Sequence, residues 1–207
     1  MARKSYTAEE REKIRETLLT AMLQCIIDKG LIHSSIDVLS KKAGISRAYF
    51  YTFFSSKEEL VLEAIRYQQP KLLRQAREQM ADPSLSWREA VEKFLRSCCY
   101  GSRNGVAVLS AEEEQEVFRY LKPESHRIFR QAQLKFFSEM LRIFGIPEGG
   151  ADPKLFGNMA LVMLMVYKGM PGSLPFLFYE AADAMAEFQI KALADWLEQA
   201  RKSAAGS

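Results

Sequence analysis

Residues 35–54 have the sequence SIDVLSKKAGISRAYFYTFF, which predicts two short helices joined by a tight turn. Ser35 and Ser46 each precede a helical pattern and can cap it, because a serine hydroxyl accepts a backbone N–H of the first turn. Gly44 lies between the two helices, where a residue that adopts positive φ can end the first one. The segment therefore predicts a helix-turn-helix.

The second of these helices has an apolar face and a polar face. Phe50 and Phe54 are four residues apart and share the inward face. The outer positions are Arg47, Ala48, Tyr49, Tyr51 and Thr52. This surface suits a DNA major groove, because arginine and hydroxyl groups bind phosphate and a small residue lets the helix approach base edges. An ordinary helical hairpin with a polar surface fits the same pattern, so both interpretations remain open at this point.

Helix-start signals recur along the chain, and strand signals are almost absent. Thr7, Ser56, Ser86 and Ser110 each lie three residues before a glutamate, the spacing of a capping box. We therefore expect an all-α fold with about nine helices, in which Pro70 kinks or divides the fourth. Their predicted ranges are 7–29, 36–43, 47–54, 57–80, 86–101, 110–120, 123–144, 153–169 and 174–200.

The chain divides most clearly at residues 81–84, Ala-Asp-Pro-Ser. Residues 1–80 carry 14 basic and 10 acidic side chains, whereas the remainder carries 15 basic and 16 acidic ones. We expect a helix-turn-helix DNA-binding domain over 1–56, a connecting helix over 57–80, and a larger C-terminal ligand-binding and dimerisation domain over 81–203. The modest positive charge belongs to the N-terminal part.

Composition limits the class of protein. The 207 residues are 48% apolar, enough for a buried core, and their net charge is only +3. The longest apolar run, residues 159–167, is far shorter than the roughly 20 residues of a membrane-spanning helix. Three cysteines and the absence of an apolar leader predict a soluble cytoplasmic protein without a disulfide framework.

The N-terminal segment resembles a known family, the tetracycline-repressor-like (TetR) transcriptional regulators. The resemblance covers about residues 10–65 and is carried by Gly30, Ser35-Ile36, Leu39, residues 42–48, Phe50-Tyr51, Phe54 and residues 56–60. It implies a homodimer that binds a palindromic double-stranded DNA operator, and a repressor that a small-molecule effector releases from it.

The resemblance implies a role in DNA binding for eight residues. Tyr51 and Lys57 would contact phosphate, and Ser35, Ser46 and Arg47 would assist them. Those that would face the bases are Ala48, Tyr49 and Thr52.

Two of the neighbouring positions can be judged on physical grounds. Lys57 begins a helix whose free N–H groups already favour an anion, which supports a phosphate contact. Phe53 departs from the family, which often has histidine or another polar group at this position. Phe53 either serves packing or touches a thymine methyl group.

The resemblance also implies an effector cavity among the C-terminal helices. Its candidate residues combine inward aromatic or sulfur-containing side chains with nearby polar atoms. They are Phe94, Ser97, Cys98, Tyr100, Tyr120, Phe129, Phe137, Met163 and Tyr167. They predict an apolar, aromatic-containing small molecule as effector, although any one of them can equally be an ordinary core residue.

Other polar groups have simpler explanations than a site. The acidic cluster Glu112, Glu113, Glu114 and Glu116 opens a helix, where the dipole favours carboxylates, so we expect a solvated helix start. His33 and His126 have no partner at metal-ligand spacing. Cys98 and Cys99 are neighbours on a helix and project about 100° apart, which favours packing over a mutual disulfide.

Catalytic motifs are missing from the sequence. It contains no Gly-rich phosphate loop, no G-x-S-x-G and no H-E-x-x-H. We therefore expect no enzyme, no cofactor and no metal. The competing class is a helical small-molecule-binding or interaction module without DNA binding.

The last two predicted helices suggest a dimer interface. The helix over 153–169 is apolar nearly all round, and the last helix repeats this with Ala181, Ala184, Phe188 and Ala192 beside Met185 and Leu193. A helix with two apolar faces needs two partners, its own core and another subunit. We expect a two-fold interface of four helices.

Overall fold

A computed structural model gives the fold of residues 6–100, 105–168 and 178–205. Within these ranges the chain forms nine α-helices, two short 3-10 helices and no strand, which confirms the expected all-α class. The α-helices are α1 (Ala8–Lys29), α2 (Ile36–Lys42), α3 (Arg47–Phe50), α4 (Lys57–Met80), α5 (Trp87–Tyr100), α6 (Ala111–Arg119), α7 (Pro123–Ile143), α8 (Pro153–Lys168) and α9 (Ala182–Ala205). The 3-10 helices are η1 (Leu31–His33) and η2 (Tyr179–Ala181).

Reciprocal capping bonds begin three of the four helices for which the sequence predicts a capping box. The boxes of Thr7 and Ser110 are closed in both directions, and Ser86 and Glu89 also exchange both bonds. Ser56 differs, because Glu59 accepts from the N–H and the hydroxyl of Ser55 instead. The serine still caps α4, and the glutamate reaches one residue further back.

Two helices have bounds that differ from the prediction by more than one residue. α3 ends at Phe50, and bonds from Thr52 N–H to Tyr49 O and from Phe53 N–H to Phe50 O tighten the next residues into turns. α9 begins at Ala182 after a 3-10 helix and runs to Ala205, beyond the predicted end at 200. The predicted start of that helix, residue 174, lies outside the described residues.

Pro70 does not divide α4, which is one helix from Lys57 to Met80. A proline in a helix interior removes one backbone hydrogen bond and crowds the preceding turn. The packing of α4 against α1, α5 and α7 holds the helix together across this position.

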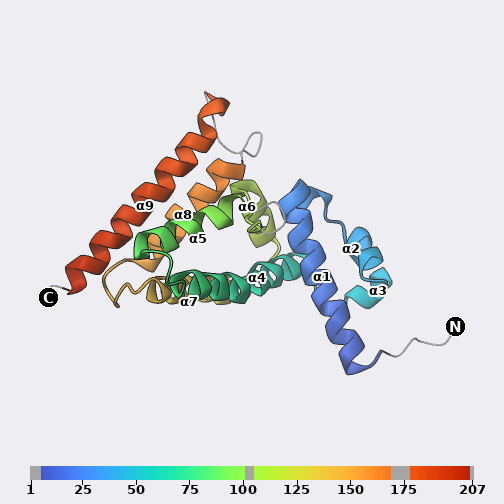
Figure 1. Cartoon of the computed structure of the whole chain (residues 1–207). Helices are drawn as coiled ribbons and strands as arrows, with labels where there is room; N and C mark the ends of the chain where they lie inside the picture. Colours follow the sequence, from blue (N-terminus) through green and yellow to red (C-terminus); the bar gives the residue numbers. More distant parts are fainter. Residues whose placement is uncertain (1–5, 101–104, 169–177, 206–207) are drawn as a thin grey trace.

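The buried side chains form two cores. The N-terminal core joins α1, η1, α2, α3 and the first half of α4, and it also takes in Ala107 and Val117. The C-terminal core joins the second half of α4 with α5, α7, α8 and α9. Figure 1 shows α1 to α3 at one end of the molecule and α9 along the opposite edge, with α4 running between them. α4 therefore belongs to both cores.

Candidate DNA-binding surface

The helix-turn-helix is built by two serine caps and one glycine. Ser35 Oγ accepts from Val38 N–H at 3.3 Å and Ser46 Oγ accepts from Tyr49 N–H at 3.1 Å, so each serine begins its helix. Gly44 has a φ of 67°, and no atom lies within 4 Å of the position that a Cβ would take. The backbone conformation, rather than a lack of space, therefore requires glycine here.

The packing of two phenylalanines fixes which face of α3 points outward. Phe50 and Phe54 are buried in the N-terminal core, with ring centroids 5.9 Å apart. Both serine caps, Arg47, Ala48, Tyr51 and Thr52 remain exposed. The structure thus brings six of the eight residues predicted to bind DNA to the surface of one small unit.

Arg47 is held by two neighbours on this surface. Its Nη1 donates to Asp37 Oδ2 at 2.9 Å, although both side chains are more than half exposed. A hydrogen bond to Tyr51 and the negative charge of Asp37 raise the pKa of Arg47, so the guanidinium stays charged. Asp37 lies in the first turn of α2. The ion pair therefore links the two helices of the helix-turn-helix across their outer face.

Tyr49 is turned towards α1 instead of standing free on the surface. Its hydroxyl accepts from Arg11 Nη1 at 2.9 Å, and its half-buried ring lies 4.9 Å from that of Tyr6 and 5.5 Å from that of Phe53. The Arg11 guanidinium also lies 4.9 Å from the Phe53 ring centroid, a cation–π distance. Of the two alternatives for Phe53, the contacts support packing. Arg11 and Tyr49 together fasten α3 to α1.

Lys57 lies where the helix-turn-helix meets the rest of the chain. Its Nζ donates to the carbonyl of Leu31 at 3.0 Å and the side chain is half-buried. An ammonium group has three donors, so Lys57 can keep this bond and still donate to a phosphate oxygen. The same carbonyl accepts from Ser34 N–H and Ser34 Oγ, which closes η1.

Glu113 ties α6 to this point. Its Oε1 accepts from the N–H of Leu31, and its Oε2 accepts from Ser110 N–H to complete the capping box of α6. A Cβ added at Gly30 would lie 3.0 Å from Glu113 Oε1, so the carboxylate also needs glycine at that position. Glu113 is half-buried and differs from the solvated helix start that the sequence predicts. The other three glutamates of the cluster are exposed as expected.

Sequence reasoning missed three of these contributors, namely Arg11, Asp37 and Glu113. Each acts through a contact between segments at least ten residues apart. The capping-box signal at Ser110 does identify Glu113, but only as a partner of its own helix. No local pattern indicates that its second oxygen binds a loop 82 residues away.

Residues 18–64 match the family described as bacterial regulatory proteins, tetR family. The N-terminal segment of this chain is therefore of the TetR type. The match coincides with the helix-turn-helix and the start of α4, the segment from which the sequence analysis drew its resemblance. TetR-family regulators are DNA-binding transcription factors without catalytic activity, which confirms the expectation that the chain is not an enzyme.

Two curated relatives support the TetR assignment over the same region. The HTH-type transcriptional regulator SrpR of Pseudomonas putida is 37% identical over 65 residues, which cover 31% of this chain and 29% of SrpR. The HTH-type transcriptional activator FasR of Mycolicibacterium smegmatis is 33% identical over 88 residues, 41% of this chain and 40% of FasR. The chain spans less than half the length of these relatives.

Solved structures share the fold over most of the chain's length. SCO7518 of Streptomyces coelicolor A3(2) aligns with a TM-score of 0.57 over 89% of this chain and 98% of its own, at 14% identity. A TetR transcriptional regulator from Legionella pneumophila aligns with a TM-score of 0.53 over 96% of this chain and 98% of its own, at 17% identity. The likeness at this identity concerns the fold.

The residues predicted to bind an effector do not form one group. Phe94, Cys98 and Met163 are buried in the C-terminal core, and Phe137 packs against it. Ser97 Oγ donates to Phe94 O and accepts from Gln75 Nε2. Phe129 packs against the N-terminal core, and Tyr120 is 65% exposed. The side chains of Tyr100 and Tyr167 lie outside the described residues.

Two hollows in the described part of the chain have walls that include none of these nine residues. A groove of about 880 Å³ runs between α1, α4, α7 and the loop before α8, and its wall includes Leu19, Tyr67, Leu73 and Phe136. A smaller hollow of about 380 Å³ lies beside Trp87 and Arg201. The groove has the size of a small-molecule site and touches both cores.

The two adjacent cysteines are packing residues. Burial raises the pKa of Cys98 to about 12, and burial together with the charge of Glu187 raises that of Cys99 to about 11. Both thiols are therefore protonated near neutral pH, and a protonated thiol is a poor nucleophile.

The described residues contain neither a metal-binding cluster nor a membrane-spanning helix. No group of histidine, cysteine and acidic side chains there could hold a metal ion. No helix of that part of the chain is both long and apolar enough to span a bilayer.

Proposed function

We propose that the chain is a cytoplasmic, ligand-responsive repressor that binds a palindromic operator through α2 and α3. The exposed face of residues 46–52 over the buried Phe50 carries this proposal. A short helix presented in this way fits the major groove, with its N-terminal residues near base edges and its flanks on phosphate. Residues 1–56 would bind DNA, 57–80 connect, and 81–203 bind the effector and the second subunit.

The surface of α8 and α9 supports a homodimer. Leu161, Val162, Met185 and Phe188 are 38%, 48%, 40% and 73% exposed, while the opposite faces of the same helices are buried in the C-terminal core. Large exposed apolar side chains grouped on two neighbouring helices mark an interaction surface. A dimer through this surface would place its two recognition helices one DNA turn apart, about 34 Å.

The groove between α1, α4 and α7 is the candidate effector site. Its wall combines apolar side chains such as Leu19 and Phe136 with charged ones such as Arg15 and Arg142. It suits a small apolar or aromatic molecule that also carries a polar group. Because the groove touches both α1 and α4, a bound molecule would act on the angle between the helix-turn-helix and the connecting helix. Such a molecule changes DNA affinity only through its different affinity for the two arrangements.

Binding to two duplexes tests the DNA-binding function. One is a 40-bp duplex of mixed sequence, and the other is selected by the chain from a random pool. Lys57→Ala should weaken binding to both alike and reduce the salt slope by about one, because it removes a phosphate contact. Thr52→Ala should change the base preference instead. Lys135→Ala on α7, an exposed lysine far along the chain, is the control of equal charge.

Wild-type binding by both Lys57→Ala and Tyr51→Ala would overturn the assignment of this surface to DNA. A reporter behind the selected sequence gives the sign of regulation. Transcription should fall when the chain is expressed, and a rise would make the chain an activator, as the name of FasR states for that relative.

A further inference from the structure

Asp37 is a carboxylate on a surface that otherwise offers cations and hydroxyl groups to DNA. Its side chain is 64% exposed, and its Oδ2 accepts from Arg47 Nη1 at 2.9 Å. Arg47 begins α3 and is 58% exposed, and among the described residues Asp37 and Tyr51 are the side chains that hold its guanidinium. An exposed cation of this surface is therefore already paired within the protein.

This pairing affects the charge that a duplex meets. The affinity of a protein for DNA rises with each phosphate that one of its free cations neutralises. Each such contact also releases counterions from the DNA, which makes binding more sensitive to salt. While Arg47 stays on Asp37, the pair contributes no net charge. If Arg47 leaves for a phosphate, the exposed carboxylate of Asp37 remains unpaired close to other phosphates, and like charges repel.

Because an exposed ion pair is only weakly stabilising, DNA can displace it where other contacts compensate. A correct base sequence supplies such contacts, and an unrelated sequence does not. Repulsive elements of this kind raise specificity by lowering the affinity for wrong partners.

From these observations we infer that Asp37 restrains Arg47 and thereby suppresses binding to DNA of unrelated sequence. The inference rests on the proposed function, since it assigns Asp37 a role within the same DNA-binding surface. It makes Asp37 a specificity-determining residue that acts through Arg47 and not through a DNA contact of its own.

The test measures binding to the 40-bp mixed-sequence duplex between 50 and 200 mM salt. Asp37→Asn should bind about three- to fivefold more tightly than wild type, and its salt slope should steepen by about 0.9 as Arg47 becomes free for one phosphate. Its gain on the duplex selected from the random pool should be smaller, so the ratio of the two affinities falls. Both side chains are exposed, so the variant should keep the wild-type melting temperature.

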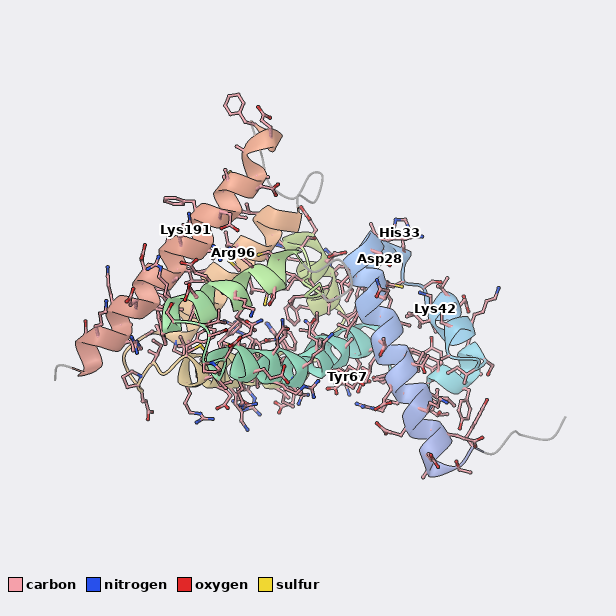
Figure 2. The ribbon with its side chains drawn as sticks, viewed as in Figure 1. Asp28, His33, Lys42, Tyr67, Arg96 and Lys191 are labelled. Atoms are coloured by element: carbon pink, nitrogen blue, oxygen red, sulfur yellow. The ribbon has the colours of Figure 1, made fainter. Side chains whose placement is uncertain are left out.

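Two further variants show whether Asp37 acts through Arg47. In an Arg47→Gln background, Asp37→Asn should give a clearly smaller gain, because only the repulsion between the Asp37 carboxylate and phosphate is then removed. The control of equal charge is Asp28→Asn on α1, where Asp28 accepts from Gln24. Figure 2 shows Asp28 near the end of α1, on a different helix from Lys42 of α2. This control should change binding less than twofold.

Three results would overturn the inference. An equal gain from Asp37→Asn with and without Arg47 would reduce its role to general charge repulsion. No gain in either background would remove the role altogether. DNA binding that falls with Lys57→Ala while Asp37→Asn has no effect refutes this inference but keeps the proposed function, whereas no DNA binding by any variant refutes both.

Discussion

The two cores of this chain differ in what surrounds them. The N-terminal core, built mostly from residues 14–64, is covered by capped short helices whose outer side chains are mostly polar or charged, apart from the exposed Ile32 and Val38. Arg47 and Lys57 are already held there by hydrogen bonds. The C-terminal core is built from residues 76–197 and leaves large apolar side chains of α8 and α9 exposed. The N-terminal region buries most of its apolar side chains within a single chain. The C-terminal region has an apolar face that a second chain can cover.

The two cores also meet at a small number of identifiable contacts. α4 contributes to both, Val117 of α6 is buried in the N-terminal core, and Glu113 binds the Leu31 N–H. A rotation of α6 or α4 would therefore act directly on the loop that precedes α2. In the proposed mechanism, these contacts would carry a movement in the C-terminal part to the candidate DNA-binding surface without a long chain of intermediates.

The largest effect should be a loss of self-association when the apolar face of α8 and α9 is changed. Phe188→Glu places a charge on the exposed face of α9 and should weaken self-association by about 2–5 kcal/mol, because a charge in an apolar interface is left unpaired. Sedimentation at micromolar concentration should then show a monomer with unchanged helicity. Ile128→Glu on α7, also an exposed apolar position, is the matched control and should leave the dimer intact. A wild-type monomer would contradict the expected interface.

A smaller effect, on the free energy of unfolding, should follow from removing the contact that Glu113 makes with Leu31. Glu113→Ala leaves two backbone N–H groups without their acceptor and should lower the free energy of unfolding by roughly 1–3 kcal/mol. Amide exchange of residues 30–34 should rise, while that of α8 and α9 stays as in wild type. Glu114→Ala, an exposed neighbour in the same helical turn, is the control. Equal exchange in both variants would mean that Glu113 acts only as a helix cap.

The smallest effect should be a change in the pH dependence of the free energy of unfolding. It arises at Glu139 of α7, which forms ion pairs with Arg77 of α4 and with Arg142. Hydrogen bonds from Arg142 and Arg77 lower the pKa of Glu139 to about 2, below its ordinary value of 4.5. A lowered folded-state pKa stabilises the protein fully above pH 4.5, and this contribution is lost as the pH falls towards 2. Glu139→Gln should flatten the stability curve in that window and cost at most about 1 kcal/mol at pH 7, because the ion pairs lie at the surface. A parallel curve for the variant would contradict the assignment.

Much of the fold could be predicted from local chemistry. Serine caps, capping-box glutamates and Pro123 mark helix starts correctly, because these residues satisfy backbone groups within one turn and need no distant partner. The stop of α3 at Phe50 was predicted wrongly, since residues 51–54 keep a helical pattern but close their bonds as turns. The range of α4, 57–80, was predicted correctly, and of the two alternatives at Pro70 the division was wrong.

The candidate site divides along the same line. The sequence alone identifies the helix-turn-helix, most of its outward residues and its resemblance to the TetR family, because these depend on local spacing. Tertiary structure decides that Tyr49 turns to Arg11, that Arg47 is paired with Asp37, and that Glu113 reaches Leu31. In each contact the two side chains come from different segments. Local periodicity predicts which face each side chain occupies, but it does not predict that the two faces meet. Spacing within a helix predicts which face a side chain occupies, and only the packing of helices selects the partner it meets there.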